Sequence, residues 1–128
     1  MVAHGTIAFD TLTTSDQVNT GTEKSLDTSY IFNGTAKSWI TFDGSGTIAI
    51  TDSFNHSTIA DEGTGIYRMN FSNNMGNATY SIQTHDYSYG NGWSDTFTTS
   101  GYDTKRRNES GGYQDVAAIW SNVLGDLA

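Results

Sequence analysis

Apolar and polar residues alternate most clearly between residues 34 and 71, and this pattern predicts four strands there. Three of these strands show the alternation most clearly. Residues 36–42 direct Ala36, Ser38, Ile40 and Phe42 to one face, residues 47–52 direct Ile48 and Ile50 to one face, and residues 66–71 do the same with Tyr67, Met69 and Phe71. Asp-Gly clusters at residues 43–46 and 61–65 predict turns, because glycine adopts positive φ and Asp accepts local hydrogen bonds. We expect a β-meander of two hairpins that the rest of the chain covers or extends.

Shorter strand-like segments flank this stretch. We predict strands over residues 5–12, 28–33, 78–85, 96–99 and 113–124. Residues 113–124 are the most apolar, and we expect a strand buried on both faces there rather than a helix. The polar residues 100–112 predict a hairpin or loop, and Asn33-Gly34 a two-residue turn. Residues 1–27 form an N-terminal strand and polar arm in this interpretation, and residues 28–128 form a β-sandwich domain.

The composition supports the same fold class. The chain has 128 residues, of which 35% are hydrophobic and only 16% charged, and its polar residues are mainly Thr, Ser and Asn. This length suits one domain, and a Thr-rich chain with 12% aromatic residues fits strands better than helices or disorder. We therefore predict an all-β protein, an antiparallel β-sandwich or jelly-roll-like barrel.

The net charge of −8 narrows the range of partners. Binding to nucleic acid or to an anionic membrane needs a basic face, so neither partner is expected. The absence of cysteine excludes disulfides and thiolate metal sites. No apolar stretch is long enough for a membrane span, and no signal-peptide pattern follows Met1, so we expect no membrane insertion and no Sec-type export.

Residues suited to catalysis or metal binding are present without a convincing pattern. His4, His56 and His85 lack metal-ligand spacing, and no G-x-S-x-G motif occurs. The acidic residues Asp43, Asp52, Asp61 and Glu62 could include a glycosidase pair, but each is better explained by a turn or strand end. A loose calcium site near residues 61–62 stays open as an alternative. We expect a non-enzyme without a cofactor or metal.

Residues 85–93, HDYSYGNGW, are the first candidate binding segment. Rigid amphipathic rings beside Ser, Gly and Asn are typical of binding loops, and flat rings near amides suit sugars. The candidate binding residues are His85, Tyr87, Tyr89 and Trp93. Alternatively, these aromatic side chains cap the end of the barrel or pack against a neighbouring subunit.

Lys105, Arg106 and Arg107 are the second candidate, because they hold half of the positive charge of the chain. In a functional interpretation they contact phosphate or an acidic sugar at a cell surface. The favoured alternative is a solvated hairpin tip, or ion pairs with Asp or Glu across a subunit boundary.

Several short stretches resemble one known family. They are GTAKSWITFDG at residues 34–44, GTIA at 46–49, DSFN at 52–55 and DEGTG at 61–65 followed by Tyr67, Asn70 and Phe71, together with GTI at 5–7, DTL at 10–12, SLDTSY at 25–30 and the terminal GDLA. The pattern resembles a module in tail-fibre-like structural proteins of marine bacteriophages. It covers most of residues 5–80 and the last few, whereas residues 85–112 do not fit it.

The resemblance implies a virion structural protein that is made in the host cytoplasm and mounted on the particle as a homotrimer with other virion proteins. As a tail-fibre or tail-tip module it would attach to a host-surface glycan or protein. The alternative is a capsid decoration, head fibre or adaptor with a purely structural role. Thr-rich strands of modest apolar content agree with further burial at a subunit interface.

Overall fold

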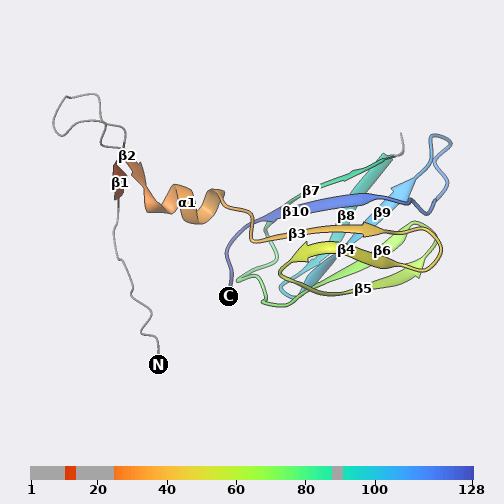
Figure 1. Ribbon diagram of the computed structural model, residues 1–128, viewed down its shortest axis with the longest axis horizontal. Helices are drawn as coiled ribbons and strands as arrows, with labels where there is room; N and C mark the ends of the chain where they lie inside the picture. The colour runs from red at the N-terminus through yellow and green to blue at the C-terminus, as the bar shows by residue number, and fades with distance from the viewer. Residues whose placement is uncertain (1–10, 14–24, 88–90) are drawn as a thin grey trace. The chain divides into compact units, whose positions relative to one another are not determined.

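The computed structural model describes residues 11–13, 25–87 and 91–128, and its contacts divide the chain into two units, Met1–Thr35 and Ala36–Ala128. The first unit contains an antiparallel pair of short strands, β1 (Thr11–Thr13) and β2 (Ser25–Asp27), followed by one helix, α1 (Thr28–Gly34) (Figure 1). The predicted strand over residues 5–12 lies mostly outside the described residues.

The helix α1 corrects the prediction of a strand over residues 28–33 and of a turn at Asn33-Gly34. Asp27 is the N-cap, and its carboxylate accepts a hydrogen bond of 2.8 Å from the backbone N–H of Ser29. Such a cap satisfies one of the N–H groups that the first helical turn leaves unpaired. The β-branched and aromatic residues Tyr30, Ile31 and Phe32 suggested a strand. The hydrogen-bonded N-cap and the helical turn that follows it outweigh this preference.

The second unit is a β-sandwich of two antiparallel four-stranded sheets (Figure 1). The first sheet has the order β4-β3-β10-β7, with β3 (Ser38–Asp43), β4 (Ala49–Phe54), β7 (Ser81–Asp86) and β10 (Ile119–Leu124). The second has the order β5-β6-β9-β8, with β5 (His56–Gly63), β6 (Ile66–Phe71), β8 (Asn91–Thr98) and β9 (Gly101–Arg107). The all-β sandwich prediction is confirmed.

The two predicted hairpins exist, but they do not form one meander. β3 pairs with β4 in the first sheet, whereas β5 pairs with β6 in the second. Asn55 is the single residue between β4 and β5, and it has a positive φ of 58°. Its amide donates hydrogen bonds of 3.1 Å to the carbonyls of Lys37 and Asn73, which hold this sharp reversal in place. The chain therefore changes sheets where the sequence suggested only a short connection.

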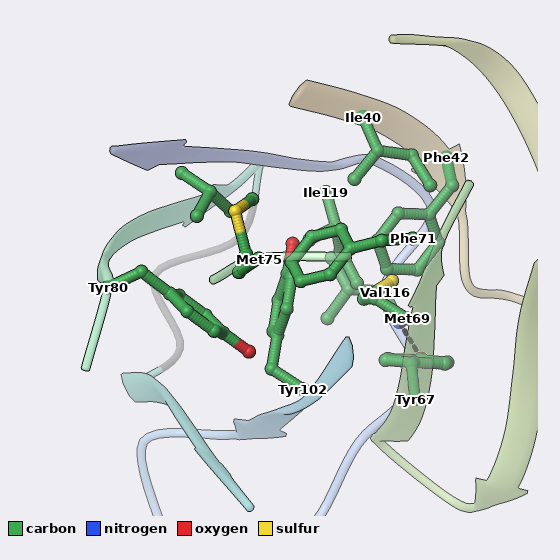
Figure 2. Close-up of a cluster of buried hydrophobic side chains, with 11 residues drawn as sticks. Ile40, Phe42, Tyr67, Met69, Phe71, Met75, Tyr80, Tyr102, Val116 and Ile119 are labelled. Atoms are coloured by element: carbon green, nitrogen blue, oxygen red, sulfur yellow. Dashed lines mark hydrogen bonds between the residues drawn. The ribbon is translucent and has the colours of Figure 1, made fainter. Parts of the chain in front are cut away.

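The core lies between the two sheets (Figure 2). Its buried members come from β3, β6, β9 and β10 and from the loops beside them: Ile40, Phe42, Tyr67, Met69, Phe71, Met75, Tyr80, Tyr102, Val116, Ile119 and Val123. The buried tyrosines keep their hydroxyl groups paired: Tyr67 donates to the carbonyl of Gly44 at 2.9 Å and Tyr102 to the hydroxyl of Ser121 at 2.7 Å. The faces predicted for β3 and β6 are confirmed.

Two predictions for the C-terminal third are wrong. Residues 101–107 form β9, a central strand of the second sheet, and not part of a polar loop. Only residues 119–124 of the predicted strand 113–124 form β10, and its burial alternates: Ile119, Ser121 and Val123 are buried, whereas the residues between them are exposed. One face of β10 is therefore exposed to solvent.

Candidate binding faces

The outer face of the first sheet carries a cluster that we name the tryptophan face: Trp39, Thr41, Gln83, His85, Trp120 and Asn122. Because successive side chains of a strand point to opposite faces, the burial of Ile40 and Ser121 places their neighbours outside. Trp39 and Trp120 expose 38% and 41% of their surface, which is unusual for such large apolar side chains.

The strand register arranges the tryptophan face in two rows. Asn122 lies opposite Trp39 on one side and Gln83 on the other. In the next row Trp120 lies between Thr41 and His85, and its ring stacks on the His85 ring with centroids 6.2 Å apart and planes 29° apart. Each row therefore combines an indole with polar side chains.

The tryptophan face borders a hollow of about 890 Å³. Its lining includes all six residues of the face, together with inward-facing neighbours on the same strands and residues 92–94 of β8. Ligand sites of small molecules typically enclose about 300–1,000 Å³ and combine apolar walls with a few polar groups. The hollow has the size and the mixed chemistry of such a site.

The polar groups of the tryptophan face have no partners within the described part of the chain. The indole N–H groups of Trp39 and Trp120 and the side chains of Thr41, Gln83 and Asn122 make no hydrogen bond there. Amides both donate and accept, so Gln83 and Asn122 can satisfy either kind of group on a ligand. These groups are available for recognition.

Positive charge is concentrated on the other sheet. The strands β3, β4, β7 and β10 contain no Lys or Arg, whereas β6 and β9 carry Arg68, Lys105, Arg106 and Arg107. Asp52 lies beside Thr41 on the edge strand of the first sheet. The strands that form the tryptophan face therefore offer no cation to an anionic ligand.

Trp93, a sequence-predicted binding residue, lies in β8 of the second sheet and is already engaged. The Arg107 guanidinium sits 4.7 Å from the centre of the Trp93 ring and 4.8 Å from that of Tyr113. The Trp93 indole N–H donates to the Asp95 carboxylate at 3.0 Å, as does the Lys105 ammonium at 2.7 Å. One face of the Trp93 ring and its indole N–H are thus occupied within the chain.

The Asp95 carboxylate organises the charges of this second cluster. Partial burial opposes ionisation, but hydrogen bonds from Lys105, Trp93 and Thr96 hold the pKa of Asp95 below its usual value. The hydrogen bond between Lys105 and Asp95 also raises the pKa of Lys105. Nearby, Arg68 forms an ion pair with Asp103. Lys105 and Arg107 therefore have partners within their own chain and do not lie at a solvated hairpin tip.

Arg106 is buried rather than exposed. It forms an ion pair with Asp86 of β7 at 3.1 Å, and both side chains are 3% exposed. Burial lowers the pKa of Arg106, while the charge of Asp86 opposes that shift. Gly92 lies opposite Arg106 in the sheet, and a Cβ at Gly92 would meet the guanidinium Nη1 at 1.8 Å. Arg106 thus has a structural role that joins the two sheets.

The remaining candidates of the aromatic segment separate from one another. His85 belongs to the tryptophan face, and Tyr87, just after β7, is 83% exposed. Tyr89 lies outside the described residues. His85 and Trp93 lie on strands of different sheets, although both border the hollow.

Two of the carboxylates considered for catalysis, Asp43 and Asp61, accept hydrogen bonds within local turns. Asp43 accepts hydrogen bonds from the N–H and hydroxyl of Ser45 at 2.8 and 2.6 Å, and Asp61 accepts from the N–H of Gly63 at 2.9 Å. Among the described residues, no three His, Asp or Glu side chains cluster in a way that could hold a metal ion. Over the same residues, no helix has the length and apolar character to cross a membrane.

Comparisons with protein-family models, curated proteins and solved structures find no match for this chain. Sequence reasoning found His85 but missed Trp39, Trp120, Gln83 and Asn122. Alternation within each strand could have indicated that Trp39 and Trp120 point away from the core, because Ile40 and Ile119 point into it. Only the pairing of β3 with β10 shows that the two tryptophans are neighbours.

Proposed function

We propose that this protein is a non-catalytic attachment module of a bacteriophage virion, a tail-fibre or tail-tip component that contacts the host surface through the tryptophan face. The observation that carries the proposal is the pair of exposed indoles, Trp39 and Trp120, beside unpaired amides in a hollow of about 890 Å³. Central aromatic side chains supply much of the affinity in binding sites. The resemblance of residues 5–80 to tail-fibre-like proteins supports the virion assignment.

The proposal includes assembly as a homotrimer on the particle. In the first unit, α1 has no buried residue, and Tyr30 and Phe32 expose 70% and 57% of their surface. Apolar surface of this kind is stabilised when neighbouring copies cover it. Three copies of one weak binding site also raise the overall avidity without a new contact.

Binding of purified protein to host cells tests the attachment role. Trp39→Ala and Trp120→Ala should each weaken binding by about tenfold or more, as expected for central aromatic residues. Phe97→Ala is the matched control, because Phe97 is similarly exposed, at 41%, but lies on β8 of the other sheet and outside the lining of the hollow. Circular dichroism and thermal unfolding verify that each variant is folded. Undiminished binding by the double variant Trp39→Ala/Trp120→Ala would contradict the proposal.

A further inference from the structure

We infer that the ligand of the tryptophan face is an uncharged carbohydrate, held by stacking on Trp39 and Trp120 and by hydrogen bonds to Gln83 and Asn122. This inference rests on the proposed attachment function and names its ligand class. It depends on three features of the described residues: the ring geometry, the unpaired amides and the distribution of charge.

The ring geometry suits flat, weakly apolar rings. Trp39 and Trp120 are diagonal neighbours on paired strands, because Trp39 lies opposite Asn122 and Trp120 opposite Thr41. Such neighbours are about 7–8 Å apart, so one extended ligand can contact both indoles. The C–H face of a sugar ring packs on an indole, while its hydroxyls point outward to polar neighbours.

The unpaired amides discriminate between a sugar and an apolar protein surface. Gln83 and Asn122 lie side by side across β7 and β10, and Asn122 also lies beside Trp39. An apolar partner would bury these amides without hydrogen bonds, at a cost of about 1–3 kcal/mol for each unsatisfied group. Sugar hydroxyls both donate and accept, so they satisfy the amides and the indole N–H groups together.

The distribution of charge discriminates between neutral and acidic sugars. The four strands of the first sheet have no Lys or Arg, and Asp52 adds a negative charge beside Thr41. The second sheet, which does carry cations, engages them internally: Lys105 with Asp95, Arg106 with Asp86 and Arg107 with two aromatic rings. A carboxylated or phosphorylated glycan would find no partner for its charge on the tryptophan face.

Chemical treatment of the host cells tests the ligand class. Periodate cleaves the vicinal diols of sugars, so it should abolish binding of the wild-type protein, whereas protease treatment of the cells should leave binding unchanged. Raising the salt from about 0.05 to 0.5 M should change binding less than twofold, because screening acts only on charged contacts. Loss of binding after protease but not after periodate, or a steep decline with salt, would overturn the inference.

A direct titration completes the test. Neutral oligosaccharides of glucose, mannose and N-acetylglucosamine, and acidic oligosaccharides of galacturonic acid, are added while tryptophan fluorescence is followed. We expect a neutral oligosaccharide to bind the wild type and Phe97→Ala alike, and to bind Trp120→Ala and Gln83→Ala/Asn122→Ala about tenfold more weakly. Binding of the acidic series alone, neutral binding that survives Trp120→Ala, or binding of neither series would overturn the inference.

The two proposals fail in different ways. If cell binding depends on Trp120 but resists periodate and no neutral oligosaccharide binds, the ligand class is wrong and the attachment function stands. If cell binding is independent of both Trp39 and Trp120, the attachment face itself is wrong. If Trp120→Ala changes the oligomeric mass of the protein in light scattering, the face is a subunit interface, and the inference is overturned.

Discussion

Arg106 of β9 and Asp86 of β7 form an ion pair across the two sheets, 3.1 Å apart, with both side chains 3% exposed. Asp86 follows His85 directly in β7, and Arg106 lies opposite Gly92 in β8. The ion pair therefore holds the end of β7, where His85 of the tryptophan face lies, against the second sheet. Its removal should affect both stability and binding.

We predict that Arg106→Ala destabilises the protein by about 3–5 kcal/mol, because it leaves the buried Asp86 charge without its ion-pair partner. The double variant Arg106→Met/Asp86→Leu should recover most of this loss, since an apolar pair replaces the ion pair. Urea unfolding measures both variants. Lys105→Ala is the control, with an expected change of about 0–1 kcal/mol for a partly exposed pair. A loss below 1 kcal/mol for Arg106→Ala would show that the pair does not hold the sheets together.

Gly92→Ala should also be destabilising, by about 1–3 kcal/mol, because a methyl group overlaps the Arg106 guanidinium. Gly112→Ala is a suitable control, since its Cβ would meet only the Asn108 side chain at 3.4 Å. Thermal unfolding compares the two variants. Equal midpoints would mean that Arg106 can move away from β8 freely.

The fold should lose stability in mild acid through His56. This side chain is buried between the sheets, with its Nε2 2.5 Å from the Ser38 hydroxyl, and burial lowers the pKa of His56 from 6.5 to about 4. Between pH 6.5 and pH 4, His56 is protonated in the unfolded chain but stays neutral in the folded chain. The contribution of neutral His56 to the free energy of unfolding is therefore complete above pH 6.5. It is lost as the pH falls to 4, which lowers the free energy of unfolding by up to about 3 kcal/mol.

Urea unfolding at a series of pH values measures this effect. In His56→Gln the decline between pH 6.5 and 4 should largely disappear, whereas in His85→Gln it should persist, because His85 is exposed. A wild-type protein whose stability is constant over this window would contradict the buried, neutral state of His56.

The proposed homotrimer predicts a mass three times the 13.9 kDa of one chain in light scattering of the isolated protein. Tyr30→Ser/Phe32→Ser should reduce that mass if α1 contributes to the subunit contacts. A wild-type mass near 13.9 kDa would refute the trimer.

Local alternation predicted the faces of β3 and β6, because one buried side of a strand leaves a period of two in the sequence. The strand β9 escaped prediction because its inward residues include Thr104 and Arg106, whose polarity is offset only by partners on other strands. The helix α1 was missed because the Asp27 cap outweighed the β propensity of three large apolar residues. Alternation within one strand identifies its apolar face. It does not identify the polar partners on other strands that allow a polar strand such as β9 to be buried.

The tryptophan face could not be assembled from the sequence for a related reason. Trp39, His85 and Trp120 are far apart in the chain, and only the order β3-β10-β7 makes them neighbours. Conversely, His85 and Trp93 are close in sequence, but the chain passes from the first sheet to the second between them. Proximity in sequence suggested one binding loop, but the fold places the two residues in strands of different sheets.

A reconstruction of the virion at a resolution that places this chain tests the central claim most directly. The proposal predicts three copies together at the periphery of the tail, each with Trp39 and Trp120 turned toward solvent. Density on the capsid lattice, or a tryptophan face covered by another virion protein, would contradict attachment through this face and favour a purely structural role.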